Sequence, residues 1–354
     1  SAWITHPSER ESERVEDLHR RLGQYDLQQR IGRGGMGTVY LGAHGLLDRK
    51  VAIKVLENTD ATERSLARFQ REVQLSASLK HPNTIEIYDF GRTDEGTFFY
   101  VMEFVDGISL EQLVEYYGRQ PAERVIYVLL QVCGSISEAH EAGLVHRDIK
   151  PANILLTSRS GIHDLVKVLD FGLAKQLDHD SMQLTRVDSI TGTPLFMSPE
   201  SIRDAASAGI LSDIYSIGAV GYTLLCGRPP FDEESSTEVC ARKLHEEPEL
   251  PEKAIGVPLS RDLQTLLISC LRLDPERRPQ SVGELSSKLA ACIDSPHWTQ
   301  QDAALWWREI FDGPYLDDFE MSIDDADEAN RTRGDTAVNK KRPSPVPMTN
   351  STSD

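Results

Sequence analysis

The period of the hydrophobic residues changes once along this chain, and the change divides the sequence into two parts. Residues 25–105 hold short alternating or continuous apolar runs, which are typical of β-strands, with one helical stretch at 61–78. From residue 109 onward the apolar residues recur every three or four positions, as Val125 and Leu129 do. This order predicts an α+β fold, in which a small sheet-rich lobe precedes a larger, mainly helical lobe. We expect a ligand to bind in the cleft between such lobes.

Acidic residues outnumber basic ones, 56 to 38, which gives the 354 residues a formal charge of −18. That excess argues against a chain that coats nucleic acid or an anionic membrane surface. The longest stretch without a charged residue, 214–227, is too short to span a bilayer, and no signal segment opens the sequence. The five cysteines lack zinc-ligand or C-x-x-C spacing and are predicted to be free and buried. We therefore expect a cytoplasmic chain, or a cytoplasmic piece of a longer one.

Composition separates both ends from the body of the chain. Residues 1–24 mix acidic and basic side chains and are expected to form an N-terminal extension to a body at 25–295. Segment 296–312 holds three of the four tryptophans, and we expect a Trp-rich terminal helix there. It either packs on the helical lobe or docks a partner. Residues 313–354, acidic and then basic, have almost nothing to bury and are predicted to be a disordered tail.

Three glycines, Gly32, Gly34 and Gly37, give the pattern G-x-G-x-x-G-x-V within residues 31–39. The same glycine spacing occurs in dinucleotide-binding turns, but those turns need a helix after the glycines. Here residues 38–42 alternate and predict a second strand. A strand–loop–strand of this kind predicts a flap whose backbone N–H groups close over phosphates. An ordinary glycine-rich hairpin is the alternative.

Lys54 lies inside the apolar strand that begins at Val51, where a cation without a negative partner is costly to bury. Glu72, on the helical stretch that follows, is the candidate partner. Such a pair would fix Lys54 to hold phosphate oxygens as a point charge. The alternative is a lysine on an edge strand whose ammonium group reaches water.

The densest group of polar residues lies at 146–153, where Pro151 indicates a loop rather than a helix. Asp148 and Asn153 are five positions apart, which suits them to serve one reaction centre from two sides. Asp170 follows at the end of an apolar run, in Leu-Asp-Phe-Gly. A carboxylate there can hold a hard cation through oxygen.

Residues 25–295 resemble the protein kinase family, because they carry its motifs in order: G-x-G-x-x-G-x-V, V-A-I-K, H-R-D-x-x-x-x-N, D-F-G and a variant of A-P-E. Segments 197–200 and 227–231 are most similar to the bacterial serine/threonine kinases of eukaryotic type. The resemblance implies the two-lobed protein-kinase fold, with an N-lobe at 25–105 and a C-lobe at 106–295. It also implies transfer of the γ-phosphoryl group of MgATP to Ser and Thr hydroxyls of proteins.

The resemblance implies a role for each candidate residue. Asp148 would accept the proton of the substrate hydroxyl, and Lys150 would steady the phosphoryl group. Lys54 would hold the α- and β-phosphates and pair with Glu72. Mg²⁺ would be bound by Asn153 and Asp170. The expected contacts with ATP come from Ile31, Gly32, Gly34, Gly37, Val39, Ala52, Leu155 and the backbone of Glu103 and Val105.

The resemblance also implies structural and regulatory features. Glu200 is expected to pair with Arg278, and Asp213 to brace the catalytic loop. Thr185, Ser189 and Thr191 are candidates for phosphorylation of the chain's own activation loop, for which a homodimer acting in trans is one arrangement.

Ser76 departs from the family pattern, because larger apolar residues usually stack at this position, four residues after Glu72. This leaves open how firmly the helix of Glu72 is held: either a partner or a dimer contact is needed to hold it, or the small residue is simply accommodated. Two other functions also stay open. One is a pseudokinase scaffold that binds nucleotide without turnover. The other is a kinase of small molecules, which is disfavoured because segment 192–200 resembles the platform on which kinases bind protein substrates.

Overall fold

The structure, a computed structural model, describes five stretches of the chain, which are residues 21–34, 37–56, 63–93, 96–171 and 194–311. The chain forms two compact units, Ser1–Trp307 and Arg308–Asp354. The sheets and helices described below belong to the first unit, apart from the last residues of α12. The predicted tail at 313–354 and the three candidate hydroxyls of the activation loop lie outside the described residues.

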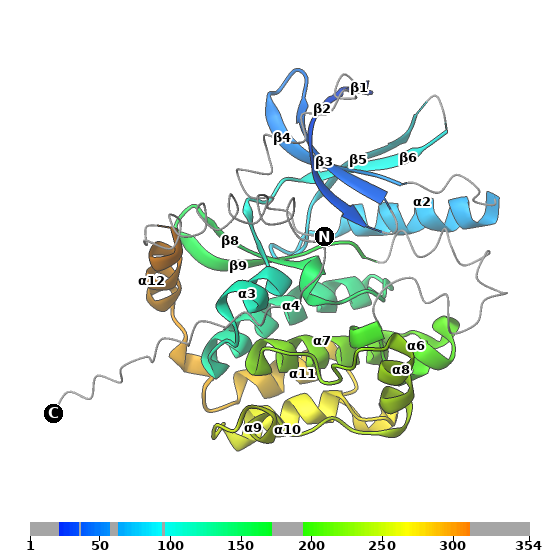
Figure 1. Cartoon of the computed structure of the whole chain (residues 1–354). Coiled ribbons are helices and arrows are strands. Elements are labelled where there is room, and N and C mark those ends of the chain that lie inside the picture. Colours follow the sequence, from blue (N-terminus) through cyan, green and yellow to red (C-terminus); the bar gives the residue numbers. More distant parts are fainter. Residues whose placement is uncertain (1–20, 35–36, 57–62, 94–95, 172–193, 312–354) are drawn as a thin grey trace, which may run out of the picture. The chain divides into compact units, whose positions relative to one another are not determined.

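The first described part of the chain forms a six-stranded antiparallel sheet with the order β1-β2-β3-β4-β6-β5 (Figure 1). Its strand β1 begins within the expected N-terminal extension, so the sheet starts earlier than residue 25. Gly37 has φ of +145°, and a Cβ there would overlap the Val55 carbonyl oxygen, so only glycine fits this close approach. The strands are β1 (Arg21–Leu22), β2 (Tyr25–Gly34), β3 (Gly37–His44), β4 (Arg49–Val55), β5 (Ile87–Arg92) and β6 (Phe98–Glu103).

Helix α2 (Glu63–Ser78) packs beside β5 and buries Val73 and Ser76. It corresponds to the helical stretch predicted at 61–78.

The remainder is mainly helical, with a core formed by α4 and α7 and closed by α10 and α11 (Figure 1). Helix α7 is buried on nearly all sides, and a Cβ on Gly221 would overlap Leu129 and Leu267, so glycine permits this close packing. Ser109 and Gln112 form a capping box that starts α3. The helices are α3 (Leu110–Tyr117), α4 (Ala122–Glu141), α6 (Pro199–Arg203), α7 (Ile210–Cys226), α8 (Ser236–His245), α9 (Pro251–Ile255), α10 (Arg261–Cys270), α11 (Val282–Ala290) and α12 (Gln300–Phe311).

A second, three-stranded sheet with the order β7-β8-β9 contacts both the large sheet, where Val168 meets the segment before β5, and helix α4 of the helical core. Its strands are β7 (Gly107–Ser109), β8 (Ile154–Arg159) and β9 (Ile162–Val168). A parallel bridge from Thr84 to Val168 joins the end of β9 to the segment before β5. Because β8 and β9 flank the predicted catalytic loop and Asp170, this sheet sets where both lie.

The five cysteines are free and buried, as predicted. In the part of the chain that the structure describes, none of the helices has the length and apolar character needed to cross a bilayer.

The tryptophans near the end of the first unit pack on the helical core around a buried ion pair. Arg124 on α4 donates from Nε and Nη2 to Asp164 Oδ2 and Oδ1, at 2.9 and 2.7 Å, and both side chains are at most 1% exposed. The indole N–H groups of Trp298 and Trp307 donate to the same carboxylate at 3.0 and 2.8 Å. The ring of Trp306 stacks 3.7 Å from the guanidinium carbon.

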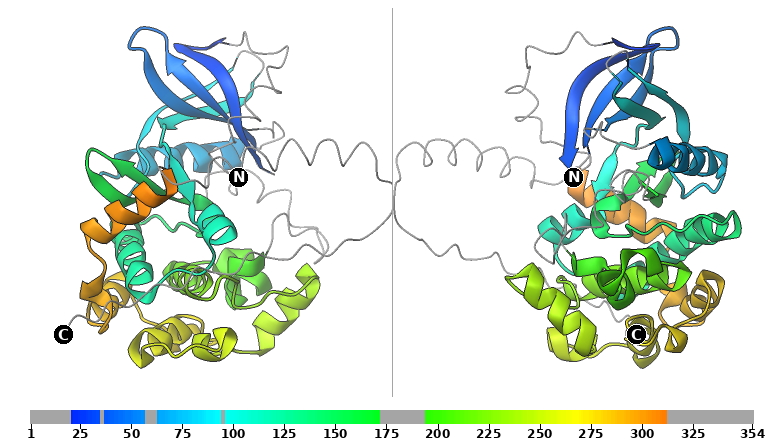
Figure 2. Two further views of the ribbon diagram at one scale, coloured as in Figure 1. Left: turned by 60° about the vertical axis from the view of Figure 1, so that its left-hand side comes forward. Right: turned by 90° about the vertical axis from the view of Figure 1, so that its right-hand side faces the viewer.

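Gln300, at the start of α12, reinforces this packing. Its side-chain amide accepts from the backbone N–H of His163 at 2.8 Å and donates to the His163 carbonyl at 2.9 Å, so α12 lies beside the β8–β9 hairpin (Figure 2). Of the two roles considered for this segment, the structure shows packing on the body of the chain.

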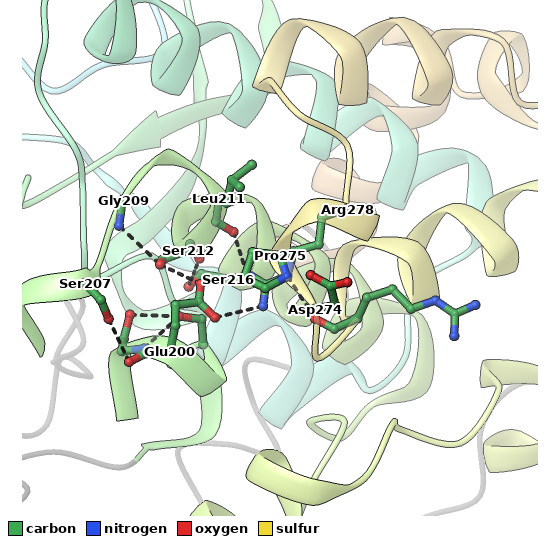
Figure 3. A network of polar contacts seen from close by, with 12 residues as sticks. Glu200, Ser207, Gly209, Leu211, Ser212, Ser216, Asp274, Pro275 and Arg278 are labelled. Atoms are coloured by element: carbon green, nitrogen blue, oxygen red, sulfur yellow. Dashed lines mark hydrogen bonds and ion pairs between the residues drawn. The ribbon is translucent and has the colours of Figure 1, made fainter. Parts of the chain in front are cut away.

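A second buried ion pair holds the segment that leads into α7 (Figure 3). Arg278 donates to both oxygens of Glu200, at 2.7 and 2.8 Å, and also to the Leu211 carbonyl at 2.9 Å. Ser212 donates to the same carboxylate at 2.7 Å. Burial alone would raise the pKa of Glu200, but the hydrogen bonds and charge of Arg278 outweigh it and lower that pKa to about 2. The predicted pairing of Glu200 with Arg278 is confirmed.

Replacing Asp164 by alanine should destabilise the chain strongly, because it leaves the buried guanidinium of Arg124 without a counter-charge. We expect the free energy of unfolding in urea to fall by about 3–5 kcal/mol. The matched control is Lys288→Ala, which breaks an exposed pair with Glu284 and should cost less than about 1 kcal/mol. Equal losses in the two variants would show that the buried pair is not a main support of α12.

Stability should also depend on pH through Glu200. Its native pKa of about 2 lies below the ordinary 4.5, so its contribution, at most about 3 kcal/mol, is fully present above pH 4.5 and is lost as the pH falls toward 2. Glu200→Gln removes the titrating group. The difference in unfolding free energy between the wild type and this variant should therefore shrink as urea titrations move from pH 6 to pH 3. A difference that stays constant would contradict this assignment.

Candidate active site

The loop between α4 and β8 is hydrogen-bonded to Asp213 on α7. Its carboxylate accepts the backbone N–H of His146 at 2.8 Å and that of Arg147 at 2.9 Å, together with the His140 ring nitrogen at 2.8 Å. Arg147 has φ of +62°, a conformation that the two backbone bonds help to fix. The prediction that Asp213 braces this loop is confirmed.

His146 ties the same loop to the end of β9, a role that the sequence analysis did not assign. Its ring is buried, with Nε2 2.9 Å from the Leu169 carbonyl and Nδ1 3.2 Å from the Asp148 backbone nitrogen. These partners require the neutral tautomer that carries its proton on Nε2, and burial accordingly lowers the pKa of His146. The histidine therefore couples the position of Asp148 to that of Asp170, the residue after Leu169.

The structure brings Asp148, Lys150 and Asn153 together. The Asn153 side-chain amide donates to Asp148 Oδ2 and to the Asp148 carbonyl, each at 2.8 Å. Lys150 Nζ lies 3.0 Å from Asp148 Oδ2. The short 3₁₀ turn η1 (Pro151–Asn153) makes this possible, because it returns the chain toward Asp148 after the proline. The carboxylate is thus oriented by two donors from its own loop.

Lys54 does not have the partner that the sequence predicted. Its Nζ lies 2.6 Å from Asp170 Oδ2, while the second oxygen of that carboxylate accepts the hydroxyl of Tyr100 at 2.5 Å. Lys54 and Tyr100 are cross-strand partners on β4 and β6, so both side chains reach Asp170 from one edge of the sheet. Burial would raise the pKa of Asp170, but the charge and hydrogen bond of Lys54 and the bond from Tyr100 lower it.

Glu72 lies beside a different cation. Its Oε1 is 3.9 Å from Nη1 of Arg147. The predicted Lys54–Glu72 pair is therefore corrected for this conformation: among the described residues, Lys54 contacts Asp170 instead. The physical reason is packing, because Asp170 is the carboxylate that lies against Lys54, whereas Glu72 lies near Arg147 of the catalytic loop. The sequence analysis also missed Tyr100, whose only signal was a hydroxyl-bearing residue in an otherwise apolar strand.

The residues expected around adenine are gathered in one apolar cluster. It joins the large sheet to the second sheet through Leu155 and includes Met102 of β6. Of the expected phosphate-binding glycines, Gly32 and Gly34 lie on β2 and Gly37 on β3, with Gly34 opposite Gly37. The remaining members of the expected set that lie in the cluster are Ile31, Val39, Ala52 and Val105.

The side chain of Glu103 forms ion pairs within the protein, so the contact with ATP expected at this residue would come from its backbone. Its carboxylate lies 2.7 Å from Arg159 and 2.8 Å from Lys167. Both cations come from the second sheet, so this buried glutamate fastens the end of β6 to β8 and β9.

Asp170 and Asn153 are oxygen donors of the kind that a hard divalent cation prefers. Within the described residues, no three His, Cys, Asp or Glu side chains are gathered as a metal cage. The donor set therefore fits a cation that arrives with the phosphates of a nucleotide and completes its coordination with phosphate oxygens and water.

The segment that follows the undescribed residues 172–193 is anchored from α8. Lys243, only 1% exposed, donates from Nζ to the carbonyl oxygens of Pro194 and Leu195, at 3.0 and 2.7 Å. Burial lowers its pKa to about 7. Ser216 on α7 adds a bond to the Phe196 carbonyl at 2.8 Å. These contacts fix the turn η4 (Pro194–Phe196), and the sequence analysis had not singled out Lys243.

Comparison with known proteins places this geometry in a family. The family model described as "Protein kinase domain" matches residues 25–289. The chain is 38% identical over 272 residues to serine/threonine-protein kinase pkn3 of Myxococcus xanthus, which covers 76% of this chain and 50% of that protein. It is 37% identical over 270 residues to serine/threonine-protein kinase PknB of Mycobacterium tuberculosis, a match that covers 75% of this chain and 42% of that protein. The chain thus spans about half the length, or less, of these curated relatives.

Solved structures agree with the sequence matches. The kinase domain of Mycobacterium tuberculosis PknI superposes with a TM-score of 0.60 at 26% identity, covering 78% of this chain and 98% of that domain. The structure of Rad53 in complex with AMP-PNP gives a TM-score of 0.62 at 25% identity, and the match covers 75% of this chain and 64% of that chain. The expected two-lobed fold is confirmed. With its motifs in order and the family match across residues 25–289, this chain belongs to the protein kinase family.

Proposed function

We propose that this chain is a serine/threonine protein kinase that transfers the γ-phosphoryl group of ATP, bound with Mg²⁺, to hydroxyl groups of proteins. The observation that carries the proposal is the meeting of Asp148, Lys150 and Asn153 on one loop, with Asp170 tied to that loop through His146. The relatives reported above, which are named as serine/threonine-protein kinases, support the same class of substrate.

In the proposed reaction, Asp148 acts on the attacking hydroxyl. Its carboxylate accepts the hydroxyl proton as the oxygen attacks the γ-phosphorus, and the bond from that phosphorus to the bridging oxygen of ADP breaks. The hydrogen bond from Asn153 and the ion pair with Lys150, both at Asp148 Oδ2, hold the carboxylate in one orientation. Lys150 lies close enough to Asp148 to contact a transferring phosphoryl group as well.

Asn153 and Asp170 would hold the cation through their side-chain oxygens. When bound, Mg²⁺ neutralises negative charge on the phosphate oxygens. Lys54 would contact phosphate oxygens as a point charge, for which it must leave Asp170. Little covalent chemistry falls to the protein, so its contribution is to position the reactants and to compensate charge.

The proposal extends to regulation and place of action. Phosphorylation of the chain's own loop hydroxyls, by a second copy acting in trans, would add a phosphate for Arg147 to bind. Five free, buried cysteines support a reducing compartment, and we propose the cytoplasm.

Asp148→Asn should abolish turnover while ATP still binds, because the amide keeps the shape of the carboxylate but cannot accept the proton. We expect phosphate transfer from radiolabelled ATP to myelin basic protein to fall by about 10²–10⁴-fold. Nucleotide affinity, measured by calorimetry, should stay close to that of the wild type. Asp204→Asn makes the same chemical change at a turn outside the site and should leave transfer unchanged.

Three outcomes separate the functions considered. A wild-type protein that binds MgATP but transfers no more phosphate than Asp148→Asn would establish a scaffold instead of an enzyme. Phosphate found on tyrosine after acid hydrolysis of the product would overturn the Ser/Thr assignment. Equal activity of the wild type and Asp148→Asn, well above the background without protein, would remove Asp148 from the reaction.

A further inference from the structure

The phenol of Tyr100 takes no part in the chemistry proposed above, yet it lies at the centre of the site. Its side chain is only 1% exposed, and it packs in the apolar cluster that also contains Val73 of α2, Met102 and Leu169. A buried hydroxyl needs a hydrogen-bond partner. The partner is the carboxylate of Asp170, at 2.5 Å.

With this bond, each carboxylate oxygen of Asp170 has a partner within the protein. One carboxylate oxygen accepts the Tyr100 hydroxyl and the other lies 2.6 Å from Lys54 Nζ. Burial, with the charge of Asp170 beside it, raises the pKa of Tyr100 well above its usual value, so the phenol stays protonated and acts as the donor. Lys54 and Asp170, the two groups that the proposed reaction needs for phosphate and cation, are therefore bonded to each other, and Asp170 is also bonded to the tyrosine.

Helix α2 shows a second sign of a resting arrangement. Glu72, the expected partner of Lys54, lies 3.9 Å from Arg147. One turn further along, the buried hydroxyl of Ser76 has no hydrogen-bond partner among the described residues. A buried hydroxyl without a partner is unfavourable. This placement of α2 therefore leaves one buried polar group unsatisfied.

We propose that Tyr100 is a positioning residue that holds Asp170, and through it Lys54, in a resting arrangement from which the cation of a bound nucleotide must release it. The proposal rests on the proposed function, because it concerns the same aspartate and lysine. Tyr100 and the cation compete for one carboxylate. Breaking the phenol's hydrogen bond is then part of the free energy of cation binding.

In an alternative arrangement, the Tyr100 hydroxyl would have the opposite effect on cation binding. If Tyr100 kept its bond to one oxygen of Asp170 while the cation bound the other, the phenol would orient the carboxylate and favour cation binding. The two arrangements are distinguished by the variant Tyr100→Phe, which removes the hydroxyl and keeps the buried ring. Competition predicts tighter cation binding in this variant, and orientation predicts weaker binding.

The experiment measures nucleotide binding, so that it does not depend on turnover. In the Asp148→Asn background, a fluorescent ATP analogue is titrated with Mg²⁺, and the midpoint concentration of Mg²⁺ is compared with and without Tyr100→Phe. We expect the midpoint to fall by about tenfold, the size expected for the loss of one hydrogen bond to a charged group. Affinity for the analogue in excess EDTA should change much less.

Tyr25→Phe is the matched control, because the Tyr25 hydroxyl also donates to an aspartate, Asp89, on the same sheet but outside the site. This variant should leave the Mg²⁺ midpoint unchanged. Thermal unfolding without ligand should show that Tyr100→Phe is folded.

A midpoint that rises, or that stays within about twofold of its parent, would overturn the resting role of Tyr100. If the Asp148→Asn protein bound no nucleotide at any Mg²⁺ concentration, the proposed function would fail instead. The two failures therefore give different results.

Discussion

The position of the proposed catalytic loop depends on one buried carboxylate, that of Asp213. Backbone N–H groups in a buried loop must find an acceptor, and the segment at His146 and Arg147 has no helix or strand to supply one. Asp213 supplies it from α7, the most thoroughly buried helix of the described chain. Because Asp148 is the next residue along, the rigidity of the helical core is transmitted directly to the proposed base.

Above that loop, the charges of the site form a set of interchangeable pairs. Lys54 contacts Asp170, and Arg147 lies near Glu72. In a poorly solvated site each charge needs a partner, so in the proposed reaction Lys54 exchanges Asp170 for phosphate oxygens. The neutral hydroxyl of Tyr100 belongs to this set because it stabilises one pairing without carrying a charge.

The rest of the helical part uses buried cationic side chains to hold irregular segments. Arg124 satisfies the carboxylate on which two tryptophans converge, Arg278 binds Glu200 and the Leu211 carbonyl, and Lys243 binds two carbonyl groups of η4. Irregular backbone has carbonyl groups without regular partners, and a long side chain with several N–H donors can satisfy more than one of them. These residues hold the segments that they contact without taking part in the proposed chemistry.

The sequence by itself determined the two-part fold and the catalytic loop, because the hydrophobic period and the short-range spacing of motifs specify them, while the Glu200–Arg278 pair was implied by the family resemblance. The Asp148–Asn153 contact, for example, spans only five residues. The tertiary structure alone decided which carboxylate Lys54 contacts, since Glu72 and Asp170 carry the same charge and only packing sets their distances. Tyr100 and Lys54 meet Asp170 across separations of 70 and 116 residues. The spacing of residues in a sequence carries no information about such distances, because they are fixed only when the sheet and helices pack together.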